Sequence, residues 1–600
     1  MTVPPEELLL AAEFPPTTRD AWRELALGVL RKSRPDLALD AVEDGLSTTT
    51  YDGVTIAPLY DTGSPAGVPG VAPYTRGTRA VGSWDVRQRH GHPDPRVTRE
   101  AILADLENGV TSLWLALGDA GLPVAALPDV LRGVFVELAP IMLDAGAQTA
   151  EAAETFFAVL VERGVEDAAG NLGADPLGWR ARTDEPVPLD VATTLAVRCT
   201  KDFPGLRAIT VDATVYHDAG GGDAEELAAS LAAGVAYLRA LTGAGLSVEQ
   251  ALGQLEFRYA ATADQFLTIA KFRAARRLWS RVAEECGTTA GQRQHAVTST
   301  AMMTARDPWV NLLRTTLACF AAGVGGADAV TVQPFDTRLG LPDDFARRIA
   351  RNTQSLLVEE ANVARVMDPA GGSWYVENLT EELAQTAWTW FTEIERAGGF
   401  VAALDGGLIA DRIAGTWAKR RDSIAHRRDP ITGVSEFPNL HERRRVRPAP
   451  PARPGGGLPQ VHYADPFESL RDRADARPAR PKIFLATLGP VAAHTARATF
   501  AANLFQAGGI EMVTSGPATD PAEIAAAFTA SGATVACLCS SDTLYAGHAE
   551  PVATALAEAG ARKIWLAGKG AYDTVDGYVF AGCDAVAVLE TTLADLGVAQ

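Results

Sequence analysis

The stretch RPKIFLATLGPVAAHTARATFAA, from Arg480 to Ala502, predicts the fold of the C-terminal part of the chain. Its apolar run from Lys482 to Leu488 is typical of a buried parallel strand. Gly489-Pro490 ends that strand, and the residues from Thr495 to Leu504 have the pattern of a helix. This order predicts the first unit of a doubly wound α/β domain, whose first turn normally grips a cofactor.

The turn itself, Pro490-Val491-Ala492-Ala493-His494, lacks the residues that usually hold a cofactor. A phosphate group favours glycines, because they let backbone N–H groups approach it. A cofactor metal needs a histidine that a carboxylate orients. Neither arrangement is present at this turn. We therefore expect no cofactor-binding residue and no metal ligand in this chain.

The alternation of strands and helices continues from this unit to the C-terminus. It predicts further strands near 510–513, 535–539, 563–567 and 585–588, and helices near 521–531 and 551–559. We interpret residues 482–600 as a flavodoxin-like doubly wound domain. Cys537 and Cys539 lie two residues apart, on one face of a predicted strand, and we expect both to be buried structural thiols.

The part of the chain before this domain alternates in the same way over about 350 residues. Predicted strands lie at 110–117, 206–215 and 329–332, and predicted helices at 99–108, 128–139, 150–163, 223–241, 264–286 and 343–360. This pattern favours a parallel sheet, and its length favours a closed (β/α)8 TIM-type barrel over residues 51–400. We expect Asp223 and Glu226 to cap one helix, and Arg273, Arg276, Arg277 and Arg281 of another to face water or a partner.

Two segments fall outside these domains. Residues 1–50 predict an amphipathic helical arm whose stripe of Trp22, Leu25, Val29 and Leu30 must be buried against the chain's own body or against a partner. Residues 401–481 are a connecting segment. From Arg443 to Pro481 it is rich in Arg and Pro and contains Gly455-Gly456-Gly457, a composition that predicts an exposed linker.

Composition limits the class of protein. The formal net charge of −20 over 600 residues argues against a nucleic-acid-binding surface. Six cysteines without framework spacing fit a reducing compartment. The sequence has no signal-peptide pattern and no apolar run as long as a membrane span. We therefore expect a soluble cytoplasmic protein that contacts neither nucleic acid nor membrane.

Generic catalytic motifs are missing. The sequence contains no phosphate loop, no zincin histidine pair and no nucleophile elbow. His90-x-His92 has no adjacent third ligand, and we interpret it as an ordinary loop pair. Gly568-Lys569-Gly570 is too short for a phosphate loop and predicts a plain turn.

Longer motifs carry a family resemblance from about residue 50 to the C-terminus. The chain resembles methylmalonyl-CoA mutases, which implies a CoA-threaded barrel, a C-terminal cobalamin-type domain and a radical rearrangement between methylmalonyl-CoA and succinyl-CoA. The motifs are PGVAPYTRG (69–77), WDVRQ (84–88), LTIAKFRAARRLW (267–279), RIARNTQ (348–354) and DPAGGSWYVE (368–377).

Two positions of the family's site are retained. The family has an Arg, eight residues and then Tyr-His, and here Arg207 precedes Tyr216-His217 with that spacing. The resemblance implies that the Arg grips the substrate carboxylate and that the His bonds to the thioester carbonyl. The alternative is a purely structural role, in which Arg207 and His217 end a barrel strand and pair locally. We expect both residues to be vestigial.

Three other positions depart from the family pattern. The family's substrate-covering Tyr has no counterpart in the shortened segment TRAVGS (78–83), and its barrel Gln falls at Gly173. The cobalt-ligand motif D-x-H-x-x-G is absent, since none of the nine histidines has an Asp two residues before it. His494 lies near that place, but Ala492 stands where the Asp would be.

The pattern therefore resembles the family's small subunits, which pair with a homologous large subunit. We expect a chain with no catalytic residue of its own in a heterodimer, with adenosylcobalamin held by the large subunit and acyl-CoA met through the complex. Two alternatives stay open. One is an autonomous acyl-CoA mutase that binds cobalamin without a histidine ligand, and the other is a CoA-thioester-binding scaffold outside a mutase.

Overall fold

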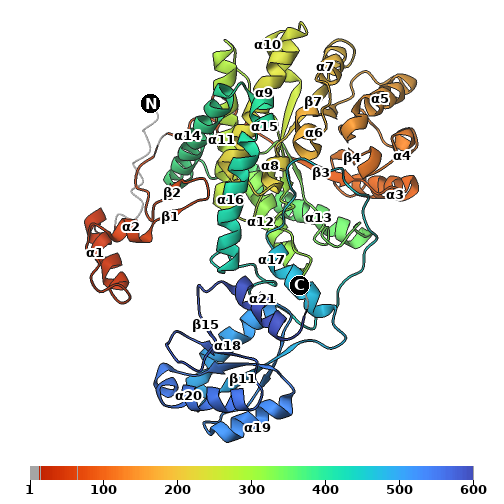
Figure 1. Cartoon of the computed structure of the whole chain (residues 1–600). Helices are drawn as coiled ribbons and strands as arrows, with labels where there is room; N and C mark the ends of the chain where they lie inside the picture. Colours follow the sequence, from red (N-terminus) through yellow and green to blue (C-terminus); the bar gives the residue numbers. More distant parts are fainter. Residues whose placement is uncertain (1–12, 14, 16, 64, 599–600) are drawn as a thin grey trace.

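Within the residues that the computed structural model describes, 13, 15, 17–63 and 65–598, eight parallel strands close into a barrel (Figure 1). The last strand pairs with the first through Ala329 and Asp85, which completes the ring. This confirms the predicted (β/α)8 barrel. The strands are β3 Asp85–His90, β4 Ser112–Ala116, β5 Ile141–Asp144, β6 Gly170–Ala174, β7 Leu206–Asp212, β8 Leu255–Ala261, β9 Gln294–Thr298 and β10 Ala329–Thr331.

Helices surround the barrel on its outside (Figure 1). They are α3 Pro95–Leu106, α4 Leu127–Val130, α5 Thr149–Arg163, α6 Pro176–Thr183, α7 Asp190–Asp202, α8 Thr214–Asp218, α9 Asp223–Gly243, α10 Val248–Gly253, α11 Gln265–Glu285, α12 Val310–Val324 and α13 Asp344–Ser355. A long helix, α14 Trp374–Arg396, packs against α9 and α11.

Side chains along the barrel strands point alternately outward, toward the helices, and inward, as β8 illustrates. Phe257 and Tyr259 point outward, where Phe257 lies 4.7 Å from Trp279 of α11. Glu256 and Arg258 alternate with them and therefore point into the barrel. The outward residues form the apolar core between strands and helices, while much of the interior of the barrel is polar.

Several predicted elements of the barrel need correction. The residues before the first predicted helix contain the first barrel strand, β3, and His90 ends that strand instead of lying in a loop. Periodicity missed β3 because Val86 is its one apolar residue, and charged or polar side chains occupy the other five positions. The helix predicted at 128–139 is reduced to α4, which ends at Val130.

The predicted exposure of two arginines on α11 is wrong. Arg273 and Arg276 are fully buried. Arg273 pairs with Asp368 and Glu377, while Arg276 donates to the backbone carbonyl of Tyr74 at 2.9 Å. Burial is tolerated because protein oxygens replace water around each guanidinium.

The expected capping pair of α9 is also wrong. Gly222 is the N-cap, and its N–H donates to the carboxylate of Glu225 at 2.9 Å. Glu226 lies one position further on, where it is fully buried and pairs with Lys271 at 2.6 Å. Glu226 therefore belongs to an internal ion pair and not to a cap.

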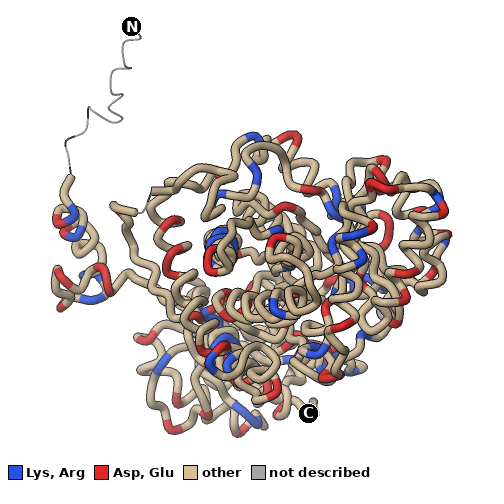
Figure 2. The backbone as a smooth tube through the Cα atoms, turned by 90° about the horizontal axis from the view of Figure 1, so that it is seen from above, with Lys and Arg blue, Asp and Glu red and all other residues tan. Residues whose placement is uncertain are grey.

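The N-terminal arm contains α1 Arg19–Leu30 and α2 Val42–Leu46, followed by the short strands β1 Thr48–Thr49 and β2 Thr55–Ile56. The helices α1 and α2 stand away from the barrel in both Figure 1 and Figure 2, while the hairpin of β1 and β2 lies against it. Ion pairs from Arg19 and Arg23 to Glu43, at 2.5 and 2.6 Å, tie α1 to the segment around α2. Leu25 and Val29 of the predicted stripe remain 73% and 65% exposed.

The segment between the domains is more ordered than an extended linker. It contains α15 Phe400–Asp405, α16 Leu408–Ala425 and α17 Asp465–Asp475. Phe467 and Leu470 of α17 are buried in the same core cluster as strand residues of the C-terminal domain. On the other side of α17, Arg306 of the barrel lies 2.5 Å from Asp472. The helix α17 therefore joins the two domains.

The C-terminal domain has a parallel sheet in the order β12-β11-β13-β14-β15, which is the flavodoxin order and confirms the prediction. The residues predicted as its last strand, 585–588, begin a helix, and the fifth strand is Gly577–Val579. The elements are β11 Lys482–Thr487, α18 Val491–Ala507, β12 Glu511–Thr514, α19 Pro521–Ser531, β13 Val535–Cys539, α20 Asp542–Glu558, β14 Lys563–Ala567, β15 Gly577–Val579 and α21 Ala585–Asp595.

Candidate functional site

Arg207 lies at the start of β7, at the N-terminal end of the barrel. It faces a cavity of about 190 Å³ that Arg293 and Thr288 also line. Burial and the positive charge of Arg293 lower the pKa of Arg207. This cavity lies at the end of the barrel opposite the one where TIM-barrel enzymes build their active sites.

His217 lies on α8, beyond the C-terminal end of β7. Its Nε2 is 2.7 Å from Oγ of Ser299, and its ring is buried. Burial and the charge of Lys271 lower the pKa of His217 to about 3, so the ring is neutral at physiological pH. His217 lines a separate cavity of about 950 Å³ together with Asp223 and Tyr463.

The structure does not bring the two retained family positions together. Arg207 opens β7, and His217 follows its last residue, Asp212. At about 3.3 Å per residue, the strand from Arg207 to Asp212 is about 17 Å long. That exceeds the distance between the carboxylate and the thioester of one short acyl group. The two side chains therefore line separate cavities.

Large side chains fill the middle of the barrel between those ends. Trp114 of β4 lies in the interior, with the guanidinium of Arg258 4.2 Å from its ring centroid. The ring of His295 meets Trp114 edge-on at 5.3 Å, and Nε2 of His295 is 2.8 Å from Oγ1 of Thr331. Four strands thus contribute to one packed layer across the axis, as is usual for the interior of a TIM barrel.

A second, charged layer lies below Trp114. Arg87 of β3 is fully buried and lies 2.5 Å from Glu256 and 3.1 Å from Asp85. Burial alone would raise the pKa of Glu256, but the charges of Arg87 and Arg293 outweigh it and lower that pKa to about 2. Both partners therefore stay ionised at neutral pH, and the layer is held by a buried ion pair.

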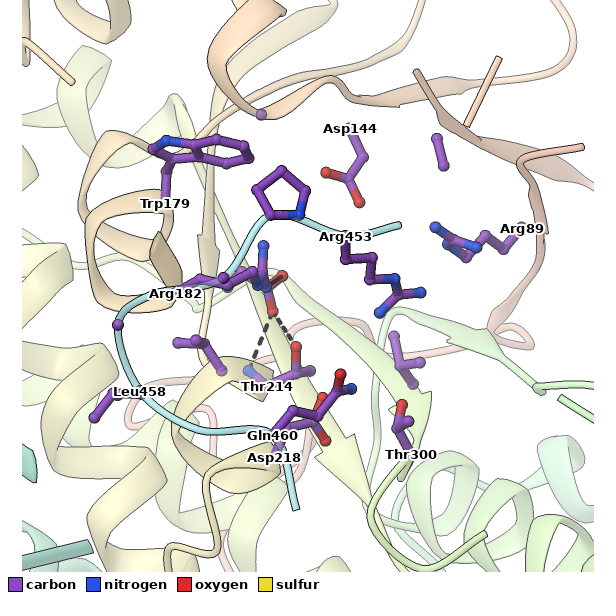
Figure 3. Close-up of a pocket in the computed structure, with 18 of the residues that line it drawn as sticks. Arg89, Asp144, Trp179, Arg182, Thr214, Asp218, Thr300, Arg453, Leu458 and Gln460 are labelled. Atoms are coloured by element: carbon purple, nitrogen blue, oxygen red, sulfur yellow. Dashed lines mark hydrogen bonds and ion pairs between the residues drawn. The ribbon is translucent and has the colours of Figure 1, made fainter. Parts of the chain in front are cut away.

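The C-terminal mouth of the barrel contains a cavity of about 330 Å³ above the Trp114 layer (Figure 3). Arg258 and Arg182 pair there with Asp212 at 3.1 and 3.3 Å. Burial raises the pKa of Asp218, which lines the same cavity, to about 7. A segment of the connecting chain, residues 453–460, crosses this mouth, and we call it the strap.

Glycine occupies the position of the family's barrel Gln for a backbone reason. Gly173 has φ of +70°, and a Cβ built there would lie 1.9 Å from the carbonyl oxygen of Leu143. The register of β6 against β7 also shifts between Asn171 and Ala174. Any side chain at residue 173 would therefore require this bulge to rearrange.

The shortened segment 78–83 packs at the barrel end opposite the mouth. Thr78 Oγ1 donates to Asp328 at 2.9 Å, and Asp328 directly precedes β10. The segment that should carry the family's substrate-covering Tyr therefore lies at the N-terminal end of the strands.

The turn after β11 does not fit a histidine-bound cobalt cofactor. Strand β11 ends at Thr487 and α18 begins at Val491, which places His494 inside the first turn of the helix. Both ring nitrogens of His494 are buried without a hydrogen-bond partner among the described residues. A metal-ligating His needs a hydrogen-bond partner that orients its ring, and His494 lacks such a partner among the described residues.

The crevice between β11 and β13, where doubly wound domains bind ligands, is occupied by protein side chains. Ser540 Oγ donates to the carbonyl oxygen of Leu488 at 2.8 Å, and Arg497 donates to that of Ser540 at 2.8 Å. The Tyr545 hydroxyl donates to the carbonyl oxygen of Ala567 at 2.9 Å, and its ring lies 5.1 Å from the guanidinium carbon of Arg497. Cys537 and Cys539 are buried in β13 beside this crevice.

Comparison with known proteins decides the family. A family model described as methylmalonyl-CoA mutase matches residues 116–455. A protein of Streptomyces virginiae is 60% identical over the full length of both chains. The chain belongs to the methylmalonyl-CoA mutase family. That relative is named a methylmalonyl-CoA mutase small subunit.

Two further relatives in the methylmalonyl-CoA mutase family carry similar names. A protein of Propionibacterium freudenreichii subsp. shermanii, named methylmalonyl-CoA mutase small subunit, is 40% identical over 99% of this chain and 97% of its own. A protein of Mycobacterium bovis, named probable methylmalonyl-CoA mutase small subunit, is 45% identical over 92% of each. Similarity to these mutase subunits extends over both domains of the chain.

Sequence reasoning missed the residues that fill this mutase-family barrel. The sequence pattern places Trp114 in an apolar strand without showing that its ring points inward, and it does not distinguish Arg89, Arg258 or Arg453 from surface arginines. The alternation of Asp85, Arg87 and Arg89 in one strand was an available signal, because charged residues at every second position must share one face. Among the helices of the described residues, none is long and apolar enough to cross a membrane.

Proposed function

We propose that this chain is the small subunit of a heterodimeric methylmalonyl-CoA mutase, which interconverts methylmalonyl-CoA and succinyl-CoA in the cytoplasm. In this proposal a homologous large subunit holds adenosylcobalamin and carries the reacting groups. That cofactor supplies radical chemistry when it is bound. This chain supplies a folded partner surface and no catalytic residue, and Arg207 and His217 are vestigial.

The observation that carries the proposal is the packed barrel axis. A thioester that threads the barrel would have to pass Trp114 and Arg258, which lie 4.2 Å apart across the interior. The charged layer of Arg87 and Glu256 lies beneath them. Opening the axis would break a buried ion pair and uncover a packed aromatic ring, and both changes are costly.

The turn after β11 in the C-terminal domain also supports the proposal that the large subunit holds the cofactor. His494 is confined to a helix, and Arg497 and Tyr545 occupy the crevice at the switch point of the sheet. The names of the full-length relatives support it independently, since a small subunit implies a larger one.

The N-terminal arm is our candidate for contact with the large subunit. Leu25 and Val29 are exposed on a helix that stands away from the barrel (Figure 1). An exposed apolar stripe of this kind is typical of a surface that contacts another protein. We expect an obligate interface of about 2,000 Å² or more.

Co-expression with a tagged large subunit tests the proposal. We expect this chain to co-purify in a single complex and mutase turnover to require the large subunit. A double variant, Leu25→Asp with Val29→Asp, should weaken the complex at least about tenfold. Val161→Asp is the matched control, because Val161 is 69% exposed on α5 of the barrel. Turnover by this chain alone would favour an autonomous mutase, and no complex would favour a scaffold outside a mutase.

A further inference from the structure

The cavity at the barrel mouth contains two arginines that the rest of the site leaves unpaired. Arg89 is the last of the β3 side chains that point into the barrel, and Arg453 is the first residue of the strap. Neither guanidinium has a hydrogen bond or an ion pair to another residue in the part of the chain that the structure describes. Figure 3 shows the two side chains pointing toward one another across the cavity.

Their arrangement is unfavourable without a counterion. Burial and the nearby charge of Arg453 lower the pKa of Arg89 to about 10. Two guanidiniums that face each other repel unless an anion lies between them. The face of the Trp114 ring lies 5.2 Å from the guanidinium carbon of Arg89, and the charge of Asp144 offsets only part of the effect of burial and of Arg453.

The other charged groups at the mouth are already paired, only partly ionised or screened by solvent. Arg182 and Arg258 share Asp212, and Asp144 lies 3.8 Å from Arg258. Asp218 faces Arg453, but burial raises its pKa to about 7, so it carries only part of a charge at neutral pH. Asp119, at the rim, is exposed to solvent and therefore screened.

We propose that Arg89 and Arg453 together bind a small oxyanion with two negative charges, either a phosphate or a dicarboxylate, in the mouth cavity. Guanidinium groups bind both kinds of anion with paired hydrogen bonds. The cavity volume of about 330 Å³ admits a small ligand. The Trp114 layer closes the axis below it, so the ligand is a free small anion and not the head of a thioester that threads the barrel.

The strap gives such binding a structural consequence. Leu458 N donates to the carbonyl oxygen of Ala181 at 2.7 Å, and a Cβ on Gly457 would lie 2.3 Å from the same oxygen. The end of the strap is thus docked on α6, while the side chain of Arg453 makes no hydrogen bond to any residue that the structure describes. A bound anion would fix Arg453 to β3 and so fasten the beginning of the strap over the mouth.

Calorimetric titration of the full-length chain tests this inference. The probes are inorganic phosphate and malonate, each in a low-chloride buffer at pH 7. Arg89→Gln and Arg453→Gln should each weaken binding about tenfold or more, since each removes a charge-assisted hydrogen-bonding group. Arg443→Gln is the matched control, because Arg443 is an exposed arginine of the same connecting segment and does not line the cavity.

Hydrogen exchange provides a second readout that does not depend on the stability of a variant. Binding should slow exchange in residues 453–460 of the wild-type chain and leave α1 unchanged. Binding of phosphate alone identifies a phosphate site, binding of malonate alone identifies a dicarboxylate site, and either supports the inference. Equal weakening by Arg443→Gln, or no binding of either probe at 10 mM or so, would overturn it.

Discussion

The guanidinium of Arg258 lies over the ring of Trp114 at 4.2 Å, on the axis of the barrel. Arg258 comes from β8 and Trp114 from β4, on opposite sides of the ring of strands. Their contact therefore spans the interior, and His295 completes the layer from β9. The barrel of this mutase-family member is a packed core at that level.

Removing the ring of Trp114 should destabilise the barrel. Trp114→Ala leaves a cavity in a packed layer and is expected to cost about 3–5 kcal/mol of the free energy of unfolding. Trp374→Ala is the control, since Trp374 is 50% exposed and should cost much less. Denaturant unfolding followed by tryptophan fluorescence and circular dichroism measures both. Equal losses in the two variants would contradict a packed axis.

The ion pair of Arg87 and Glu256 should make stability depend on acid pH. The folded pKa of Glu256 is about 2, below its ordinary value of 4.5, so its contribution is complete above pH 4.5 and is lost as pH falls toward 2. Glu256→Gln leaves Arg87 buried with a weaker partner and should cost about 3–5 kcal/mol at neutral pH. Thermal unfolding from pH 6 to pH 2 checks this. The variant should lose less stability than the wild type over that range, and parallel curves would refute the assignment.

Asp218 should make the stability of the folded state depend on pH in the opposite direction. Its folded pKa is about 7 against an ordinary 3.8, so ionisation destabilises the folded state progressively as pH rises from about 4 through 7. Asp218→Asn removes that cost. We expect the variant to match the wild type below pH 4 and to exceed it above pH 7 by about 4 kcal/mol, since each pKa unit corresponds to about 1.4 kcal/mol. A constant difference in melting temperature between pH 4 and pH 8 would show that Asp218 does not titrate in this way.

Restoring the family's glutamine at residue 173 should damage the barrel. Gly173→Gln places a Cβ against the Leu143 carbonyl oxygen at a positive φ, and we expect a loss of about 2 kcal/mol or more. Gly164→Gln is a control with the same kind of backbone, because the φ of Gly164 is +65° and a Cβ built there meets no other part of the described chain within 4 Å. Comparison of the two melting temperatures separates the steric clash from the backbone strain. If both variants melt alike, the close approach to Leu143 carries no cost.

Apolar periodicity was sufficient to predict the outline of the fold. The strand from Lys482 and the long helix from Asp223 were found where the structure has β11 and α9, because their patterns are strong and uninterrupted. Residues 585–588 predict a last strand because they are apolar and include two β-branched valines, but Asp584 caps them as the start of a helix. The short sequence Gly577–Val579 has too few residues to show any period.

The interior of the barrel could not be read from the sequence in the same way. Arg273, Arg276 and Glu226 look like surface residues by type, and only tertiary contacts show that oxygens or a lysine satisfy them. The separation of Arg207 from His217 likewise depends on the direction of β7, which a spacing of residues does not reveal. Arg453 reaches the barrel mouth only because the strap returns across it.

We predict that this chain does not hold the cofactor of the mutase. Titration of the isolated chain with adenosylcobalamin, followed by absorbance and by equilibrium dialysis, tests it most directly. We predict no change in the corrinoid spectrum and no corrinoid retained by the protein, with the co-purified complex as the positive control. Retention of one corrinoid per isolated chain would contradict the account.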